Sequence, residues 1–334
     1  MRYTWLAASF AATAVIVGVA LPTLQQPDQG GVHLTRIVAS APDGKTSVSA
    51  GKNCAASPHV CGYPDATNAG VPASAPRRLV PSQVSSGPGW KFDPRGWVEV
   101  YGNGAVLSGL YIPYNLDISA SNVTIKDVEV VKTGQGYGIS LRHTSNVTIE
   151  GSDIYSTYAS GPNRLQVAIK DIYGDSIGTT IESNNIWHAS TGIQLSEGKI
   201  EDNYVHDLAY TTGDHVNGIV SDAGDHLGLT IEHNTVFTGV SQTDAIALFE
   251  DFGAQFDATI TDNLLAGGDY TVYGGANPGR WTPSNIIITD NRFARAYFPN
   301  AGFYGPDAAV ITGRNGDAWS GNIWDDTGIT IKPY

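Results

Sequence analysis

The sequence is poor in charged residues. Asp, Glu, Lys and Arg make up only 15% of its 334 residues, against roughly 25% in an ordinary soluble domain. Positive charge is the scarcer kind, because 19 Lys and Arg stand against 32 Asp and Glu and leave a formal net charge of -13. A chain this acidic repels phosphate, which argues against a nucleic-acid partner. Methionine occurs once, whereas 39 Gly and 16 Tyr are typical of β-structure with many turns.

Cysteine is nearly absent too. The only two, Cys54 and Cys61, lie in CAASPHVC. Together with His59 they make a thin set of metal ligands, so a disulfide that closes a small loop is the better interpretation, provided that the chain reaches an oxidising compartment.

Long apolar runs are missing after the N-terminus, so no later segment is expected to span a membrane. The N-terminus itself reads MR followed by TWLAASFAATAVIVGVAL. This pattern predicts a secretory signal over residues 1–20, with Gly18-Val19-Ala20 as the cleavage site. The alternative is an uncleaved membrane anchor, since the run is almost long enough to span a bilayer. We therefore expect a secreted protein with no membrane association after cleavage.

A helical 3.6-residue period is also lacking in every window. From Trp97 onward, short β-branched runs alternate with Gly, Asn and Asp turns. SNVTIKD (121–127) almost recurs as SNVTIEG (145–151), and its isoleucine marks a series of equivalent positions. The series is Ile125, Ile149, Ile181, Ile200, Ile231, Ile260 and Ile288. An asparagine follows by three residues in most units, at Asn184, Asn203, Asn234, Asn263 and Asn291, and Asn322 extends the row.

These repeats predict a coil. One strand, an Asn turn, a second strand and a loop form a rung, and stacked rungs place each strand beside its copy. Asn tolerates the left-handed backbone that such a turn needs, and stacked amides can hydrogen-bond along the row. Further strands are expected at 137–142, 167–171, 191–196, 217–222, 244–250 and 270–275. A propeller blade would need about 40–45 residues, and a sandwich would not repeat one Asn at one offset.

On these residues the sequence resembles the pectate-lyase-like right-handed parallel β-helix proteins. The resemblance implies an all-β, single-stranded right-handed parallel β-helix of about nine rungs over residues 91–334. Residues 21–90, rich in Ser, Pro and Gly, are expected to form a linker or irregular cap. Within them CGYPDATNAGVPAS is similar to a lead-in found ahead of β-helix domains in exported proteins. In such folds the loop after the third strand varies, and variable loops on a rigid coil usually carry function.

One outward face gathers several of the scarce charges. Strand residues alternate inward and outward, so Ile139 and Leu141 point in while Ser140 and Arg142 point out. Matching the rungs places Lys170, Gln194, Val220, Ala247 and Tyr273 in the column of Ser140. Asp222 falls in the column of Arg142. The neighbouring loops add Arg164, Asp214, His215, Asp225, His226, Asp244, Glu250 and Asp251.

The first interpretation of this face is a polysaccharide lyase, in which Lys170 acts as base and Arg142 neutralises the substrate carboxylate. Two cations on adjacent rungs depress each other's pKa, which helps a lysine to accept a proton. β-Helix lyases of this kind often hold Ca²⁺, and the oxygen ligands here would be Asp214, Asp222 and Asp251, with Asp244 as a further candidate.

Two alternatives stay open. A glycoside hydrolase would need two carboxyl groups, supplied by Asp222 with Asp244 or Asp214 and tuned by His215. A non-catalytic glycan-binding or cell-surface β-helix would need neither. The motifs of polygalacturonases (N-T-D, D-D, G-H-G, R-I-K) and of pectate lyases (W-x-D-H, R-x-P-x-x-R) are missing, so no enzyme family is matched.

For the partner, the sequence predicts an extracellular polysaccharide bound by a monomer, with the link to carbohydrate resting on fold-level analogy. Exposed aromatic rings stack on sugars, and the residues expected to bind substrate are Arg164, Tyr173, Tyr210 and Tyr273.

Overall fold

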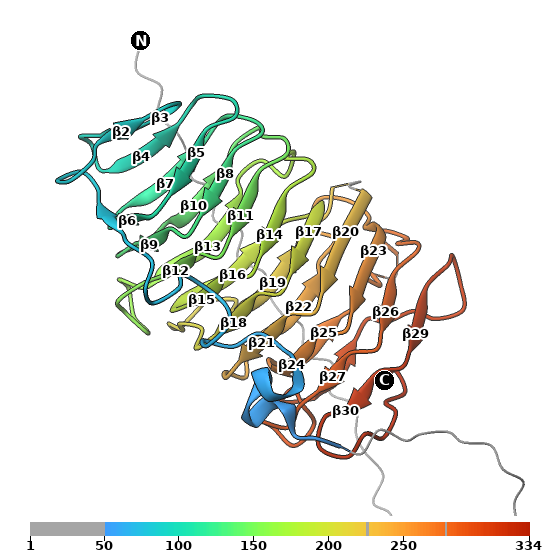
Figure 1. The fold of residues 1–334 in the computed structure, drawn as a ribbon. Coiled ribbons are helices and arrows are strands. Elements are labelled where there is room, and N and C mark those ends of the chain that lie inside the picture. Colours follow the sequence, from blue (N-terminus) through green and yellow to red (C-terminus); the bar gives the residue numbers. More distant parts are fainter. Residues whose placement is uncertain (1–50, 225–226, 278) are drawn as a thin grey trace, which may run out of the picture. The chain divides into compact units, whose positions relative to one another are not determined.

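A computed structural model describes residues 51–224, 227–277 and 279–334. The predicted signal sequence, its cleavage site and the first part of the predicted linker lie outside these residues. The described chain winds through three parallel sheets, passing in each turn from sheet 1 to sheet 2 to sheet 3 (Figure 1). Nine turns follow one another along sheet 2. The predicted right-handed parallel β-helix is therefore confirmed.

Sheet 1 carries the predicted functional face, and from β4 onward each of its strands leads into a strand of sheet 2. Its first three strands, β2 to β4, pair in antiparallel fashion and cap the coil, and the others are parallel. In order, its strands are β2 (Ser86–Gly87), β3 (Trp90–Asp93), β4 (Trp97–Val100), β7 (Asn115–Ile118), β10 (Tyr137–Leu141), β13 (Leu165–Asp171), β16 (Ala189–Gln194), β19 (Asn217–Ser221), β22 (Asp244–Leu248), β25 (Tyr270–Tyr273) and β28 (Gly305–Ala308).

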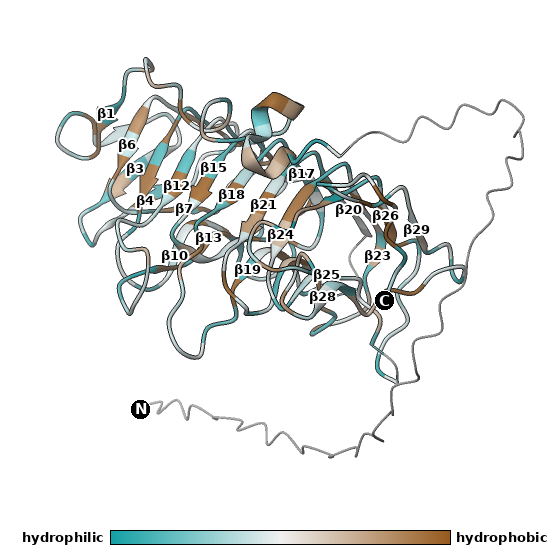
Figure 2. Ribbon diagram, turned by 90° about the horizontal axis from the view of Figure 1, so that it is seen from below, coloured by the Kyte–Doolittle hydropathy of each residue, from teal (hydrophilic) through white to brown (hydrophobic). Residues whose placement is uncertain are grey.

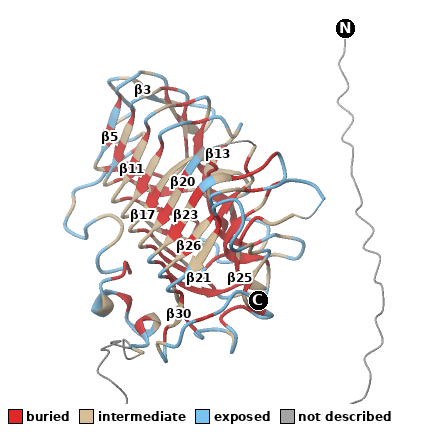
Figure 3. Cartoon of the chain, turned by 90° about the vertical axis from the view of Figure 1, so that its right-hand side faces the viewer, coloured by how far each residue is buried: buried red, intermediate tan, exposed pale blue. Residues whose placement is uncertain are grey.

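Sheet 2 holds the isoleucine series. Its strands are β5 (Val106–Ser108), β8 (Thr124–Lys126), β11 (Thr148–Glu150), β14 (Thr180–Glu182), β17 (Gly198–Glu201), β20 (Leu227–Glu232), β23 (Phe256–Thr261), β26 (Ile287–Thr289) and β29 (Ala318–Ser320). The seven isoleucines pair in register from Ile125 to Ile288 and are all buried. Each contributes about 1.5–3 kcal/mol by leaving water, so this column forms one wall of the core (Figure 3).

Sheet 3 follows the asparagine turn. Its strands are β1 (Arg78–Leu79), β6 (Leu110–Ile112), β9 (Glu129–Val131), β12 (Asp153–Tyr155), β15 (Asn185–Trp187), β18 (Tyr204–His206), β21 (Thr235–Thr238), β24 (Leu264–Gly267), β27 (Arg292–Phe293) and β30 (Ile323–Trp324). β12 and β15 of this sheet alternate between buried and half-buried residues, whereas β21 and β24 are buried throughout. Figure 2 shows these strands side by side, coloured by hydropathy. Unequal loops lead from sheet 3 back to sheet 1.

The asparagine row is a hydrogen-bonded ladder, as predicted. The side-chain amide of Asn184 donates to Asn203 Oδ1 at 3.0 Å, and the same bond recurs to Asn322 at 2.9–3.0 Å. The prediction was wrong in one detail: the left-handed residue of each turn is the one before the asparagine, for example Ser183 (φ 56°) and Asp262 (φ 50°). The extended asparagine can then turn its amide into the coil, where it is fully buried.

Asn122 and Asn146 occupy a different turn, the one that enters sheet 2, and both have left-handed backbones (φ 56° and 53°). The amide of Asn146 donates to Asn122 Oδ1 at 3.1 Å at the exposed edge of the coil. The two copies of SNVT are therefore structural turns.

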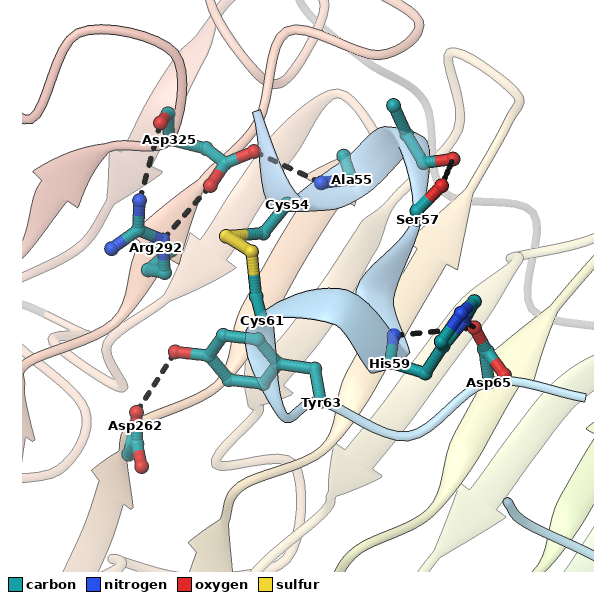
Figure 4. The surroundings of a disulfide bond; sticks show 11 residues. Cys54, Ala55, Ser57, His59, Cys61, Tyr63, Asp65, Asp262, Arg292 and Asp325 are labelled. Carbon is teal, nitrogen blue, oxygen red and sulfur yellow. Dashed lines mark hydrogen bonds and ion pairs between the residues drawn. A yellow bond between two sulfur atoms is a disulfide. The ribbon is translucent and has the colours of Figure 1, made fainter. Parts of the chain in front are cut away.

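Residues 51–77 form a strap along the coil, in the part of the chain where a linker or an irregular cap was expected. The strap begins with helices η1 (Cys54–Ala56) and η2 (Pro58–Cys61), joined by the predicted disulfide between Cys54 and Cys61 (Figure 4). Ala55 N donates to Asp325 Oδ2 at 3.0 Å, beside the last turn, and Tyr63 OH donates to Asp262 Oδ1 at 2.8 Å.

The strap then runs back along the coil. Gly70 N donates to the carbonyl of Ser183 at 2.8 Å, and the following β1 pairs with β6 near the first turn. One continuous segment therefore links the two ends of the solenoid along its outside. No helix in the described ranges has the length and apolar character to cross a bilayer.

Candidate functional site

The outward column of sheet 1 has the register that the sequence predicts. Ser140 pairs with Lys170, Lys170 with Gln194, and the column continues through Val220 and Ala247 to Tyr273. Asp171, which the sequence left unplaced, pairs with the inward-facing Leu141. Its carboxylate accepts hydrogen bonds from the backbone N–H and the hydroxyl of Ser176, at 2.9 and 3.0 Å, and holds the turn after β13.

A pocket of about 430 Å³ opens over the middle of this column. Lys170 of β13, Gln194 of β16 and Asp222, which directly follows β19, lie on three successive strands and line it. Tyr173 and Phe252 complete its apolar wall. The stacking of turns thus brings together residues more than fifty positions apart in the sequence.

Lys170, Gln194 and Asp222 form one hydrogen-bonded chain. Lys170 Nζ donates to Gln194 Oε1, and Gln194 Nε2 donates to Asp222 Oδ2. Burial lowers the pKa of Lys170, although the charges of Asp222 and Asp171 act in the opposite direction. Burial raises the pKa of Asp222 against the hydrogen bond from Gln194 and the charge of Lys170. Both groups are therefore moved toward the protonation states that proton transfer near neutral pH requires.

A second pocket of about 370 Å³ adjoins the first and shares Gln194 and Asp222 with it. His215, Asn217 and Asp251 are among its other lining residues. We call the two pockets together the groove. Asp251 also lies near Arg280, with Arg280 Nη1 at 3.8 Å from its Oδ1.

Arg142 lies at the rim of the groove and is not among its lining residues. Its Nε donates to Asp117 Oδ1 at 2.6 Å, and its Nη1 lies 3.4 Å from the hydroxyl of Tyr173. The ring of Tyr173 stacks on His143 with centroids 4.2 Å apart. Arg142 and Lys170 therefore border one site on adjacent strands, although Asp117 already balances the charge of Arg142.

Asp244 occupies the neighbouring column, next to Asn217, and is fully buried. Within the described part of the chain neither of its carboxyl oxygens has a hydrogen-bond partner. Burial, reinforced by the charge of Asp222, raises the pKa of Asp244 far above its usual range, since an unpaired buried carboxylate is costly. Asp244 is thus a neutral acid beneath the surface and does not line the groove.

Arg164 and Asp214 are paired with each other. The buried Arg164 donates from Nε to Asp214 Oδ2 at 2.5 Å, and Ser190 Oγ donates to the same oxygen at 2.8 Å. Burial raises the pKa of Asp214, but the hydrogen bonds from Arg164, Ser190 and the backbone of Thr211 outweigh it and lower this pKa overall. The pair joins two loops, and neither residue is among those that line the groove. Their predicted roles in binding substrate and metal stay predictions.

A family model described as a right-handed beta helix region matches residues 108–264. This chain contains a right-handed β-helix. The matched stretch includes Lys170, Gln194 and Asp222. A search of curated proteins found no match to the chain. The β-helix is a fold common among carbohydrate-active enzymes, and a fold alone specifies no activity.

The predicted calcium ligands are not gathered by the β-helix. Asp222 and Asp251 both line the groove, but Asp214 is held by Arg164. Across residues 51–224, 227–277 and 279–334, no group of three His, Cys, Asp or Glu side chains is arranged to hold a metal ion. The described donors therefore do not fit the predicted calcium site, and no step below passes through a metal. Asp225 and His226 lie outside the described residues.

The three predicted tyrosines are distributed unequally. Tyr173 lines the first pocket, whereas Tyr273 lies two strands beyond Asp222's strand, where burial raises its pKa to about 12. Tyr210 is exposed in the loop before β19, and neither of the two pockets includes it.

Sequence reasoning missed Gln194 as a functional residue. It was placed in the correct column, but the search for charged groups passed over a neutral amide. Phe249 and Phe252, which line the second and first pockets, were missed as well. Their signal was present in the sequence: two phenylalanines flank two acidic residues in FEDF, at the end of the strand expected at 244–250.

Proposed function

We propose that the protein is a secreted enzyme that cleaves an acidic polysaccharide by β-elimination, with Lys170 as the base. The observation that carries the proposal is the Lys170–Gln194–Asp222 chain in the groove, in which burial moves the pKa of a base downward and that of an acid upward. A lysine base suits elimination, because glycoside hydrolysis in its usual form uses two carboxyl groups.

In this reaction neutral Lys170 takes the proton from the carbon next to the uronate carboxylate. The electrons of that C–H bond form a carbon–carbon double bond, and the glycosidic C–O bond breaks. Protonated Asp222 gives its proton to the leaving oxygen. The contacts of Gln194 are compatible with Lys170 as the base and Asp222 as the acid. Gln194 Oε1 accepts a hydrogen bond from Lys170, and Gln194 Nε2 donates one to Asp222 Oδ2, which leaves Asp222 Oδ1 to carry the proton.

Arg142 is the candidate to balance the negative charge that develops on the uronate. Its contact with Tyr173 at 3.4 Å places it at the rim of the pocket that holds Lys170. To act there it would share its guanidinium between Asp117 and the substrate, which its several N–H donors allow.

Export is part of the proposal. The disulfide between Cys54 and Cys61 is typical of oxidising compartments, and the N-terminal sequence predicts a secretory signal. A polysaccharide outside the cell is the substrate that such a protein would meet.

Hydrolysis of a neutral glycan is the second candidate, favoured by Asp222 and Asp251 lining the same pocket beside His215. Two carboxyl groups across a sugar-binding cleft are the requirement of inverting and retaining glycosidases. The acidic character of the chain suits an uncharged substrate better than an anionic one.

One assay separates these functions. The protein is incubated with a panel of acidic and neutral polysaccharides, and both new reducing ends and ultraviolet absorbance are followed. Elimination yields both signals, because it leaves an unsaturated uronate, whereas hydrolysis yields reducing ends alone. Lys170→Ala that retains full activity would refute the role of Lys170. Binding without any cleavage would support a non-catalytic β-helix.

A further inference from the structure

A row of aromatic side chains continues the groove toward the C-terminal turns. Phe249 follows β22, Tyr270 and Tyr273 are the ends of β25, and Phe303 and Tyr304 precede β28. The centroids of successive rings along the row lie 5.4, 5.6, 5.7 and 4.9 Å apart. We call these five residues the aromatic platform. Figure 2 shows β25 and β28 side by side, and their residues pair in parallel register.

The platform differs from the aromatic rings on sheet 3. There, Tyr155 stacks on Trp187 at 4.0 Å and 11°, and Tyr204 on His206 at 3.9 Å and 12°, so these rings cover one another's faces. The contacts of the platform are inclined at 38° to 85°. Phe303 and Tyr304 remain 50% and 57% exposed. Large exposed apolar groups in one patch mark a binding surface.

A small hollow of about 130 Å³ connects the platform to the groove. Phe249 lines both this hollow and the second pocket, and Tyr273 and Asn277 lie on the hollow's other walls. From Lys170 the platform begins within four strand-to-strand steps along sheet 1. With neighbouring strands about 4.8 Å apart, Lys170 and Tyr273 are separated by roughly 19 Å, a length of several sugar units.

Glu250 adds an unsatisfied acceptor to the hollow. Glu250 is one of the residues that line the hollow, although it is only 4% exposed. Oε1 accepts from the backbone N–H of Gln255 at 2.9 Å, while Oε2 has no hydrogen-bond partner among the described residues. A buried polar atom without a partner is costly unless a ligand or water completes it. A sugar hydroxyl is a donor of the required kind.

We propose that the aromatic platform and Glu250 form a remote subsite for the polysaccharide, in which sugar rings lie against Tyr273, Phe303 and Tyr304 and a hydroxyl donates to Glu250. This subsite rests on the proposed function for the identity of its occupant. The subsite recognises ring faces and hydroxyls and not carboxylates, so binding there does not depend on the charge of the polysaccharide. Because the subsite lies several sugar units from Lys170, only a long chain can reach both, and long chains are therefore favoured over short ones.

The test is affinity electrophoresis of the full chain in gels that contain polygalacturonate, alginate, xylan or dextran. All variants carry Lys170→Ala, so that no gel is digested during the run. The platform variants are Phe303→Ala/Tyr304→Ala and Glu250→Gln. Tyr101→Ala is the matched control, because Tyr101 is 53% exposed and lies after β4 at the other end of sheet 1. Circular dichroism melting verifies that each variant is folded.

The reference protein carries Lys170→Ala alone. We expect the polysaccharide that retards it to bind the Phe303→Ala/Tyr304→Ala variant roughly tenfold more weakly, equivalent to about 1.4 kcal/mol of binding free energy. Glu250→Gln should weaken binding to a smaller extent, and Tyr101→Ala should leave it unchanged. Equal retardation of all variants, combined with Lys170-dependent cleavage by the wild type, would overturn the subsite and leave the proposed function standing.

The experiment also distinguishes the case in which the subsite is right and the proposed catalysis is wrong. If the platform variants lose binding but the wild type cleaves no polysaccharide, the subsite stands and the proposed catalysis fails. If the wild type forms dimers in light scattering and Phe303→Ala/Tyr304→Ala abolishes them without affecting glycan binding, the platform is an interface between two copies, and the subsite is overturned.

Discussion

Sheets 1 and 2 of the same coil differ in how much the residue type at equivalent positions varies from turn to turn. In sheet 2 one residue type repeats from turn to turn, as Ile125 to Ile288 do, and the adjoining asparagine amides satisfy one another. In sheet 1 the outward column changes at every step, from Ser140 through Lys170 and Gln194 to Tyr273. Beside that column lie polar groups without partners in the described chain, including both carboxyl oxygens of Asp244 and Oε2 of Glu250.

The difference distinguishes positions that maintain the fold from positions that are expected to bind a ligand. A position that must stack on its own copy is held to one residue type, because any other would leave a buried amide or a cavity. A position that faces solvent and a ligand has no such constraint. Variation and unsatisfied polar groups on a repetitive scaffold therefore mark the surface where binding is expected.

The strongest prediction removes the base from sheet 1. Lys170→Ala should lower cleavage by roughly 10²–10⁴-fold, the usual contribution of a positioned acid or base, while the melting temperature stays nearly unchanged. Initial rates on the best polysaccharide of the panel provide the measurement. Lys126→Ala is the control, since Lys126 pairs with Glu150 on sheet 2 at 2.9 Å, away from the groove. A similar loss in both variants would show that the effect is not specific to the groove.

A substitution in the asparagine ladder should lower the stability of the fold and not the cleavage rate. In Asn234→Ala the ladder loses three donated bonds of 2.9–3.0 Å and two accepted ones of 2.9 Å. Because partners of a removed buried group are left unsatisfied, we expect a loss of about 3–5 kcal/mol in the free energy of unfolding, followed by urea titration.

Asn122→Ala is the matched comparison for the ladder, because this exposed asparagine makes one amide bond, from Asn146 at 3.1 Å. Water can replace that bond, so the expected loss is about 1 kcal/mol. Equal losses at the two positions would contradict the view that burial makes the ladder essential.

Two carboxyl groups on the sheet 1 side of the coil should give stability opposite responses to pH. Because the folded pKa of Asp244 is raised, its contribution to stability is complete below the ordinary pKa of about 3.9 and is lost as pH rises toward the folded value. The wild type should therefore lose about 1.4 kcal/mol per pH unit relative to Asp244→Asn over that interval. Urea unfolding at several pH values measures the difference.

Asp214 is the control with the reverse sign. Its folded pKa is lowered, so its contribution is present above the ordinary pKa and is lost as the pH falls through the folded value. Asp214→Asn should consequently be less stable than the wild type at neutral pH and approach it in acid. If both variants responded in the same direction, the assignment of Asp244 as a neutral acid would be wrong.

The same contrast explains what could be predicted from the sequence. The isoleucine column, the asparagine ladder and the register of Lys170 with Gln194 were predictable, because each depends on a short repeat or on the alternation of a strand. The pairing of Arg164 with Asp214 was not, because it joins two loops of different length that have no repeat. The charge-based search likewise selected Asp244, and nothing local to that residue indicated its complete burial.

The path of the strap was beyond sequence reasoning for a related reason. Residues 51–77 have no period of their own, and their contacts reach distant turns, such as the hydrogen bond from Ala55 to Asp325 and the apolar cluster of Cys54 and Tyr63 with Phe237 and Leu264. Ser, Pro and Gly composition is typical of linkers, and it is equally compatible with a segment whose backbone is held by a preformed surface.

The most local effect is expected from the disulfide that closes the first loop of this strap. Cys54→Ser/Cys61→Ser removes a cross-link over a sequence separation of 7 residues, a short loop for which chain entropy predicts a stabilisation of about 2.4 kcal/mol. Because the hydrogen bonds to Asp325 and Asp262 and the packing of Tyr63 against Phe237 and Leu264 still hold the strap, we expect the loss to be local. Hydrogen exchange should speed up for the backbone amides of Ala55 and Tyr63, while that of Asn234 in the ladder should keep its protection. Faster exchange throughout the ladder would show instead that the strap clamps the whole coil, and that the stability attributed to the repeats depends on it.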